Sequence, residues 1–129
     1  AAIEGADLVV TSVTLTAKLD PFLDAGGLKP GAFAAVTDFA RPWHWDSMTQ
    51  LDRVIIDDTE QESNSEDRMV NPAVIKGDLR GLVTGKVAGR KNHEEKNAFV
   101  FRGLSIGDLA LAGLAVRKAL QANIGTTIS

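Results

Sequence analysis

The chain has 129 residues, of which 44% are hydrophobic and 24% are charged, and its formal net charge is -3. These values are typical of one soluble globular domain, and the slight acidity argues against nucleic acid or an anionic membrane as the main partner. No run approaches the roughly 20 apolar residues of a membrane span, and no signal peptide is visible. The lack of cysteine excludes disulfides, cysteine-ligated zinc and thiol catalysis, and it suits a reducing cytoplasm.

The sequence begins AAIEGADLVV, without an initiator methionine, and its first residues look like the end of a helix that leads into a strand. Domains seldom start in this way. Only about four strand candidates follow, whereas the strands of a parallel sheet need neighbours on both sides to be buried. We therefore expect the chain to be part of a longer polypeptide.

Three short apolar runs predict buried strands of a parallel sheet, because each is uninterrupted and ends on polar residues. They lie within residues 6–13, 32–36 and 53–58. The polar residues at their ends are Thr11 and Ser12, Thr37 and Asp38, and Asp57 and Asp58. Since an open parallel sheet binds ligands beyond the carboxyl ends of its strands, these ends predict one functional rim that includes Asp38.

The first two connections predict little regular structure. Residues 18–31 are rich in proline and glycine, which leaves room for a single helical turn at residues 22–25. Pro42 follows the second strand and predicts a short helix that ends near residue 51.

The region after the third strand predicts two helices. Thr59 and Glu62 have capping-box spacing, which favours an acidic, exposed helix over residues 60–69. The pair Asn71-Pro72 then has the form of an N-cap and first helical residue, and apolar residues recur at i, i+4, i+7 and i+8 from Ile75 to Val83, which predicts a helix that ends near Gly85.

The carboxyl-terminal part predicts a fourth strand over residues 98–101 and the longest helix over residues 106–122. Ser105 and Asp108 have capping-box spacing at the start of this helix. Its predicted packing face carries small residues that allow close approach to a sheet. That face consists of Leu109, Ala112, Gly113, Val116 and Leu120.

Five stretches, in this order and spacing, resemble the ornithine cyclodeaminase and mu-crystallin family: ADLVVTSVT, LKPGAFAAVTD, RVIIDDTEQ, GDLRGLVTGKVAGR and FVFRGLSIGDLALA. The likeness covers nearly the whole chain and matches the second half of the family's NAD(P)-binding Rossmann domain. It implies an α/β, three-layer, Rossmann-type half-domain with about four mainly parallel strands, and the glycine-rich phosphate loop GxGxxG is absent.

The resemblance implies an NAD(P)-dependent oxidoreductase or cyclodeaminase that acts on an α-amino acid or a cyclic imine. A non-catalytic binding or interaction protein, as the crystallins of this family show, is the alternative. The implied cofactor is NAD or NADP, and we expect this chain alone to bind it weakly or not at all because the phosphate loop is missing. The implied partners are a small amino-acid or imine substrate and either a second copy of the chain or the missing amino-terminal half.

The resemblance also assigns roles to individual residues. Asp38 stands at the place of the family's catalytic acid or base, and Arg102 is a candidate for binding a substrate carboxylate. The positions that match cofactor-contacting residues are Thr11, Ser12, Thr14, Val36, Thr37 and Arg41. Where the family often has AVGxDxPGK this chain has AVTDFARPW, and Phe101-Arg102 replaces Ser-Val before Gly103, which argues against ornithine cyclodeamination itself.

Each assignment has a structural alternative. Asp38 could cap the turn that follows it, and the hydroxyl groups after the first strand could satisfy the last backbone groups of that strand. Arg102 could pair with an acidic residue near Glu60 instead of a substrate.

The remaining aromatic and acidic residues are interpreted as structural. Trp43, His44 and Trp45 predict a partly exposed packing cluster, and His93, among charged residues, is predicted to be solvated. We attribute the carboxylates after the third strand to capping and exposed surface, with no metal site. They are Asp57, Asp58, Glu60 and Glu62.

Overall fold

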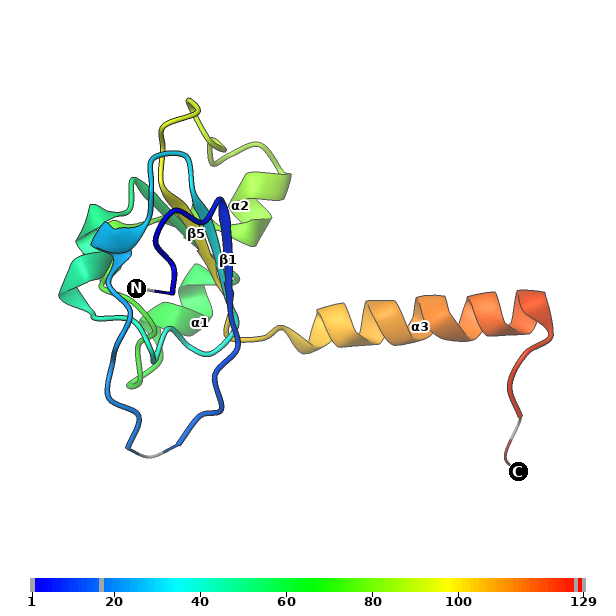
Figure 1. Ribbon diagram of the computed structural model, residues 1–129. Coiled ribbons are helices and arrows are strands. Elements are labelled where there is room, and N and C mark those ends of the chain that lie inside the picture. The colour runs from blue at the N-terminus through cyan, green and yellow to red at the C-terminus, as the bar shows by residue number, and fades with distance from the viewer. Residues whose placement is uncertain (1, 17, 127, 129) are drawn as a thin grey trace.

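The computed structural model describes residues 2–16, 18–126 and 128. Within them five strands form one sheet: β1 (Leu8–Thr11), β2 (Phe33–Val36), β3 (Arg53–Ile56), β4 (Ile75–Asp78) and β5 (Asn97–Val100). The strand order is β1-β2-β5-β3-β4, and every neighbouring pair is parallel. The predicted α/β fold with a parallel sheet is therefore confirmed, and β5 lies at its centre (Figure 1).

The helices are short except for the last one. They are α1 (Thr59–Ser63), α2 (Leu79–Val83) and α3 (Ser105–Ala122), with 3-10 turns η1 (Ala25–Gly27), η2 (Asp46–Gln50) and η3 (Pro72–Val74). The turns η1 and η2 stand close to the helical segments predicted before the second and third strands. In Figure 1, α3 extends away from the sheet.

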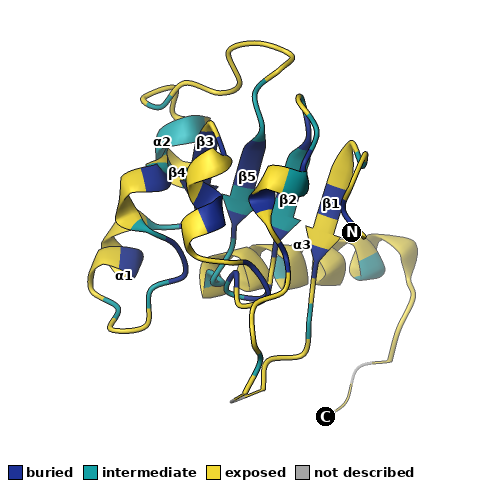
Figure 2. Cartoon of the chain, turned by 60° about the vertical axis from the view of Figure 1, so that its left-hand side comes forward, coloured by how far each residue is buried: buried dark blue, intermediate teal, exposed yellow. Residues whose placement is uncertain are grey.

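One face of the sheet is closed by the hydrophobic core. Along a strand successive side chains point to opposite faces, so alternate residues enter this core. From the strands it receives Val9, Ala34, Val36, Val54, Ile56, Ala98 and Val100. From the connections it receives, among others, Leu23, Ala25, Leu28, Trp43 and Met48. Figure 2 shows the resulting dark-blue interior.

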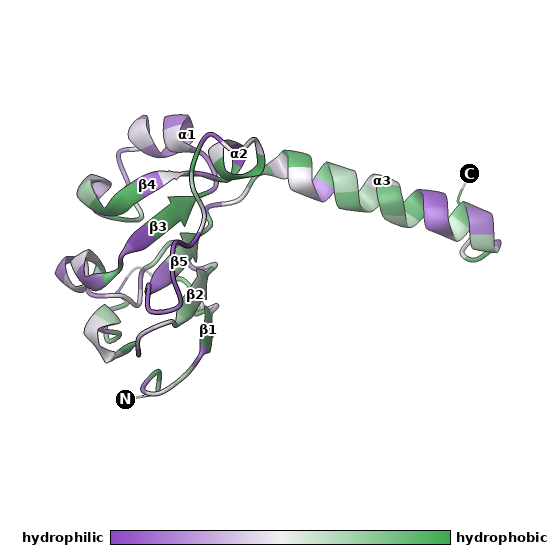
Figure 3. Ribbon diagram, turned by 90° about the horizontal axis from the view of Figure 1, so that it is seen from above, coloured by the Kyte–Doolittle hydropathy of each residue, from purple (hydrophilic) through white to green (hydrophobic). Residues whose placement is uncertain are grey.

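The other face is open on the β1 side. Leu8 and Val10 point to this face and are 62% and 64% exposed. The predicted contact between the sheet and the last helix is wrong: Leu109 and Leu120 on α3 are exposed, and α3 has no buried residue. The chain leaves β5 through Gly103, at φ 121°, and the apolar residues of α3 then lie away from the sheet (Figure 3).

Strand β4 lies where the sequence predicted a helix. Asn71 and Pro72 do begin a helical turn, but this is only the short turn η3, in which the Asn71 side chain accepts the N–H of Ala73 at 3.0 Å. The apolar spacing joined a strand residue to residues of α2 and therefore imitated one helix. At Gly77, with φ 151°, an added Cβ would lie 2.6 Å from Val87 Cγ2, so this edge strand requires glycine.

The predicted capping boxes are also wrong. Asp58 caps α1 by accepting the N–H of Gln61 at 2.7 Å, whereas the Thr59 hydroxyl donates to Asp78 at 2.7 Å. The helix ends at Ser63 and does not reach residue 69. At α3 the N-cap is Leu104, which has no capping side chain.

Candidate functional site

Asp38 joins the carboxyl ends of β1 and β2. It is 2% exposed, its Oδ1 accepts the hydroxyl of Thr11 at 3.1 Å, and its Oδ2 accepts the backbone N–H of Val13 at 3.1 Å. The Trp43 indole N–H donates to the Thr11 hydroxyl oxygen at 3.4 Å. The backbone N–H and hydroxyl of Thr37 both donate to the Thr11 carbonyl, at 3.0 and 2.9 Å. The carboxylate therefore sits in a fixed polar frame between two strand ends.

The two residues after Asp38 have an unusual backbone. Phe39 and Ala40 have φ angles of 54° and 55°. For residues other than glycine the left-handed conformation costs roughly 1–2 kcal/mol each, and it persists only where surrounding contacts impose it. Such strain tends to gather at functional sites, so this loop is a candidate part of the site.

A pocket of about 520 Å³ lies against this loop. It is lined by Leu15, Thr16, Leu19, Phe39, Arg41 and Asp67. Arg41 and Asp67 form an ion pair across the lining. The volume falls within the range of small-molecule sites, and the mixture of apolar walls with a few polar groups is typical of them.

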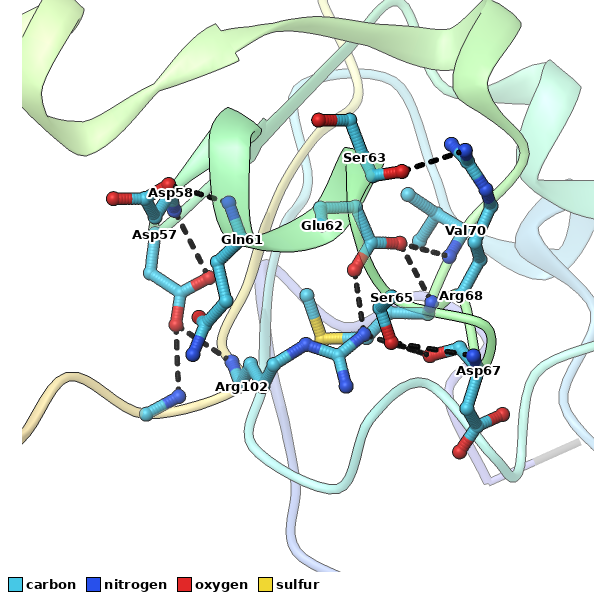
Figure 4. Close-up of polar contacts among 12 residues, drawn as sticks. Asp57, Asp58, Gln61, Glu62, Ser63, Ser65, Asp67, Arg68, Val70 and Arg102 are labelled. Carbon is cyan, nitrogen blue, oxygen red and sulfur yellow. Dashed lines mark hydrogen bonds and ion pairs between the residues drawn. The ribbon is translucent and has the colours of Figure 1, made fainter.

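Asp57 performs a different task at the end of β3. Like Asp38 it is 2% exposed. Its Oδ1 accepts the N–H of Asp58 at 3.1 Å, and its Oδ2 accepts the N–H groups of Arg102 and Gly103 at 2.9 and 2.7 Å. Figure 4 shows that these bonds hold the chain where it leaves β5. Asp57 therefore anchors the turn that leads to α3.

A buried ion pair stands beside Asp57. Glu62 is 1% exposed, and its Oε2 lies 2.6 Å from Nη2 of Arg102 (Figure 4). Its Oε1 accepts the N–H of Met69 at 2.7 Å. The same Nη2 donates to the carbonyl of Asp67 at 2.7 Å, and the guanidinium carbon lies 5.5 Å from the ring centre of Phe39.

The structure brings some of the predicted cofactor residues together and separates others. Thr11 and Thr37 are hydrogen-bonded to each other at the rim. Ser12 and Thr14 are exposed on the segment that leaves β1. The side chain of Val36 is buried in the core, so it faces away from the rim.

The two predicted arginines both have acidic partners. Arg41 lies on the pocket wall with Asp67, and Arg102 pairs with Glu62, as in the second of its two sequence-based interpretations. Glu62 is buried, whereas the sequence predicted it on an exposed helix. An arginine just after a buried strand was a signal that a buried acid should be near. This signal does not distinguish Glu62 from the other acidic residues that follow β3.

The aromatic group is partly buried. Trp43 is 3% exposed and Trp45 is 42% exposed, while His44 and His93 are both exposed. These positions agree with a packing role for Trp43 and a solvated His93.

Over the described ranges, no group of three or more His, Asp or Glu side chains is placed to hold a metal ion. The carboxylates of Asp57 and Glu62 instead accept N–H groups. In the same part of the chain, no helix combines the length and hydrophobicity needed to cross a membrane.

A parallel sheet with polar groups gathered at its carboxyl ends defines an α/β protein of the Rossmann type. A family model described as the ornithine cyclodeaminase/mu-crystallin family matches residues 1–123. The chain belongs to this family.

Three proteins illustrate this similarity. The N-((2S)-2-amino-2-carboxyethyl)-L-glutamate dehydrogenase of Staphylococcus aureus is 29% identical over 126 residues, which cover 91% of this chain and 37% of the relative. The Thermococcus litoralis Δ1-pyrroline-2-carboxylate reductase, solved with NADH and L-proline, has a TM-score of 0.79 at 24% identity, over 98% of this chain and 42% of that one. A probable ornithine cyclodeaminase from Bordetella pertussis Tohama I has a TM-score of 0.72 at 25% identity, over 97% and 43%. The chain spans 37–43% of the length of these relatives.

Proposed function

We propose that this chain forms the second half of the nucleotide-binding domain of an NAD(P)-dependent oxidoreductase or cyclodeaminase. Its substrate would be an α-amino acid or a cyclic imine. Family membership and the names of the relatives, a dehydrogenase and a reductase, support this proposal. The observation that carries it is the placement of Asp38 at the ends of β1 and β2, next to a left-handed loop and its pocket.

Asp38 is proposed to transfer a proton to or from the substrate. When bound, an NAD(P) cofactor would supply or accept the hydride. The Thr11 hydroxyl donates to the Asp38 carboxylate, and a hydroxyl oxygen also accepts hydrogen bonds. The Thr11 hydroxyl can therefore keep its hydrogen bond to Asp38, by rotation of its O–H, whether the carboxyl group is ionised or protonated.

The residues at the rim fit the nicotinamide end of a dinucleotide. Thr37 and Ser12 present exposed polar groups there, and the pocket has room for a ring rather than for a whole dinucleotide. We propose that the exposed residues Thr14 and Arg41 contribute to the same contact surface, and that the buried residues Thr11 and Val36 support it from the strand ends.

The phosphate loop would come from outside these 129 residues. Strand β1 stands at an edge of the sheet, and its open-face residues Leu8 and Val10 are exposed. An apolar strand edge of this kind favours pairing with another segment. We therefore propose that a further stretch of polypeptide pairs here, and that the isolated chain binds NAD(P) weakly or not at all.

A non-catalytic role in the manner of the crystallins is the second candidate. It is favoured by the burial of Asp38 and by the two hydrogen bonds that tie its carboxylate to the end of β1. These bonds alone give Asp38 a structural purpose.

An assay separates the two candidates. The complete polypeptide that contains this chain is mixed with NADH or NADPH and a panel of cyclic imines, and the loss of reduced cofactor is followed. The enzyme proposal expects turnover of at least one imine. Cofactor binding without turnover of any imine, or of any amino acid in the reverse direction, would support the non-catalytic role.

A further inference from the structure

We infer that Arg102 is a positioning residue, which holds the loop after Asp38 in its left-handed conformation and is itself anchored by Glu62. The inference rests on the proposed function, because the loop affects turnover only if Asp38 takes part in the reaction. Two sets of contacts and the backbone angles of the loop carry it, and Figure 4 shows the first set, between Arg102 and its acidic partners.

The first set fixes Arg102 itself. Its backbone N–H donates to Asp57 at 2.9 Å, and its Nη2 donates to Glu62 at 2.6 Å. Both acids are buried, at 2% and 1% exposure. An arginine held at its backbone and at its guanidinium group has little freedom to rotate, so it can serve as a rigid support.

The second set connects Arg102 to the loop. Its guanidinium group lies over the ring of Phe39, with 5.5 Å between Cζ and the ring centre. Its Nη2 donates to the carbonyl of Asp67, and the carboxylate of Asp67 pairs with Arg41. Phe39 and Arg41 are therefore both linked to Arg102, Phe39 directly and Arg41 through Asp67.

The third observation explains why a support is needed. Phe39 and Ala40 both have positive φ angles, which side chains other than glycine disfavour. No glycine relieves this strain, so neighbouring contacts must hold the loop in place. The guanidinium group over the Phe39 ring meets this need in a way that lysine cannot, because it binds Glu62 and the Asp67 carbonyl with directed N–H donors, whereas an ammonium group is a point charge.

This role differs from that of a substrate clamp. The positive charge of Arg102 is already matched by Glu62, and its Nη2 makes two bonds within the protein. Its Nε is buried without a hydrogen-bond partner among the described residues. A bidentate grip on a substrate carboxylate would require the Glu62 pair to open.

The first test measures the loop directly. NMR shifts of selectively labelled Phe39 and Ala40 in the complete polypeptide that contains this chain report the sign of φ, and we expect the left-handed pattern in the wild type. Arg102→Ala and the milder Arg102→Lys should both lose it, while shifts in β2 and β5 confirm that each variant is folded. Arg68→Gln is the matched control, because Arg68 donates to the Ser63 carbonyl of the same acidic segment, and it should keep the pattern. Retention of the left-handed shifts in both Arg102 variants would overturn the inference.

The second test uses turnover by the complete polypeptide. Displacement of Asp38 by a relaxed loop should lower kcat by about 10²-fold in Arg102→Lys and leave the KM of the substrate nearly unchanged. A raised KM with an unchanged kcat would identify Arg102 as a substrate clamp and overturn the positioning role. If the wild type shows no turnover, the proposed function fails, and the NMR shifts still decide whether Arg102 holds the loop.

Discussion

Asp38 and Asp57 both lie near the carboxyl end of a parallel strand and are used differently. Asp57 directly follows β3, Asp38 is the second residue after β2, and each is 2% exposed. Asp57 accepts three backbone N–H groups, whereas Asp38 accepts one backbone N–H and one hydroxyl group.

The donors explain the difference. The three donors to Asp57 are all backbone N–H groups, which can only donate, and they fix the carboxylate to the chain on both sides. Asp38 accepts a single backbone N–H, and its other partner, the Thr11 hydroxyl, can both donate and accept. Two aspartates with the same sequence signature thus become an anchor and a candidate acid or base.

The largest expected effect comes from Asp38→Asn in the complete polypeptide. Loss of general acid-base catalysis should lower turnover by about 10²–10⁴-fold, as measured by steady-state kinetics. Circular dichroism should show an intact fold, because the amide keeps the shape and an acceptor oxygen. Near-normal turnover would remove Asp38 from the mechanism and leave it with the same structural role as Asp57.

Asp57→Ala should damage the fold instead. It leaves the part-buried backbone N–H groups of Asp58, Arg102 and Gly103 without their acceptor, and an unpaired polar group costs up to about 1–3 kcal/mol when it is buried. We expect the free energy of unfolding in urea to fall by about 3 kcal/mol or more. A decrease below about 1 kcal/mol would mean that water or another group replaces the carboxylate easily.

Asp78 extends the comparison to a third strand end. It caps α2 by accepting the N–H of Gly81 at 2.7 Å, and it also accepts the Thr59 hydroxyl. Asp78→Ala should lower the free energy of unfolding by about 0.5–2 kcal/mol, the usual value of an N-cap.

The same site predicts a pH dependence. The bond from the Gly81 N–H, with that from the Thr59 hydroxyl, holds the pKa of Asp78 below its usual value. Its stabilising effect is therefore complete above the pKa of the unfolded chain and is lost as the pH falls through the lower folded pKa. The difference in urea midpoint between wild type and Asp78→Ala should shrink in strong acid. A constant difference would show that charge has no part in this cap.

The smallest effect is expected for Thr11→Val, which removes the hydroxyl donor of Asp38 and keeps the side-chain shape. One net hydrogen bond is worth about 0.5–1.5 kcal/mol, so both stability and transition-state binding should change by about this amount. Thr11→Ser, which keeps the hydroxyl, is the control. Equal losses in the two variants would show that the methyl group, not the hydroxyl, matters at this position.

The strand ends were predictable from the sequence because an uninterrupted apolar run that ends on Thr or Asp has few other interpretations. The strand β4 was not predictable in the same way. Its residues, Ile75 to Asp78, are few, lie at an edge and share an apolar spacing with α2. The spacing of apolar residues cannot distinguish a short edge strand from a helix when the helix that follows the strand continues the same spacing.

The candidate site was predictable only in part for a related reason. The rim position of Asp38 depends on the sheet, which periodicity reveals. The pairing of Glu62 with Arg102 joins residues 40 positions apart through the order of β5 and β3 in the sheet. Strand order is a property of the tertiary structure, so the contact between Arg102 and Phe39 could not be predicted from the sequence.

We propose that the β1–β2 end of the rim, and not the Asp57 end, meets the cofactor. A crystal structure of the complete polypeptide with NADH or NADPH distinguishes these two ends. We predict that the nicotinamide ring lies in van der Waals contact, within about 4 Å, of the segments around Thr11 and Thr37, on the side of Asp38. A ring bound against Asp57, or at the amino ends of the strands, would contradict the account.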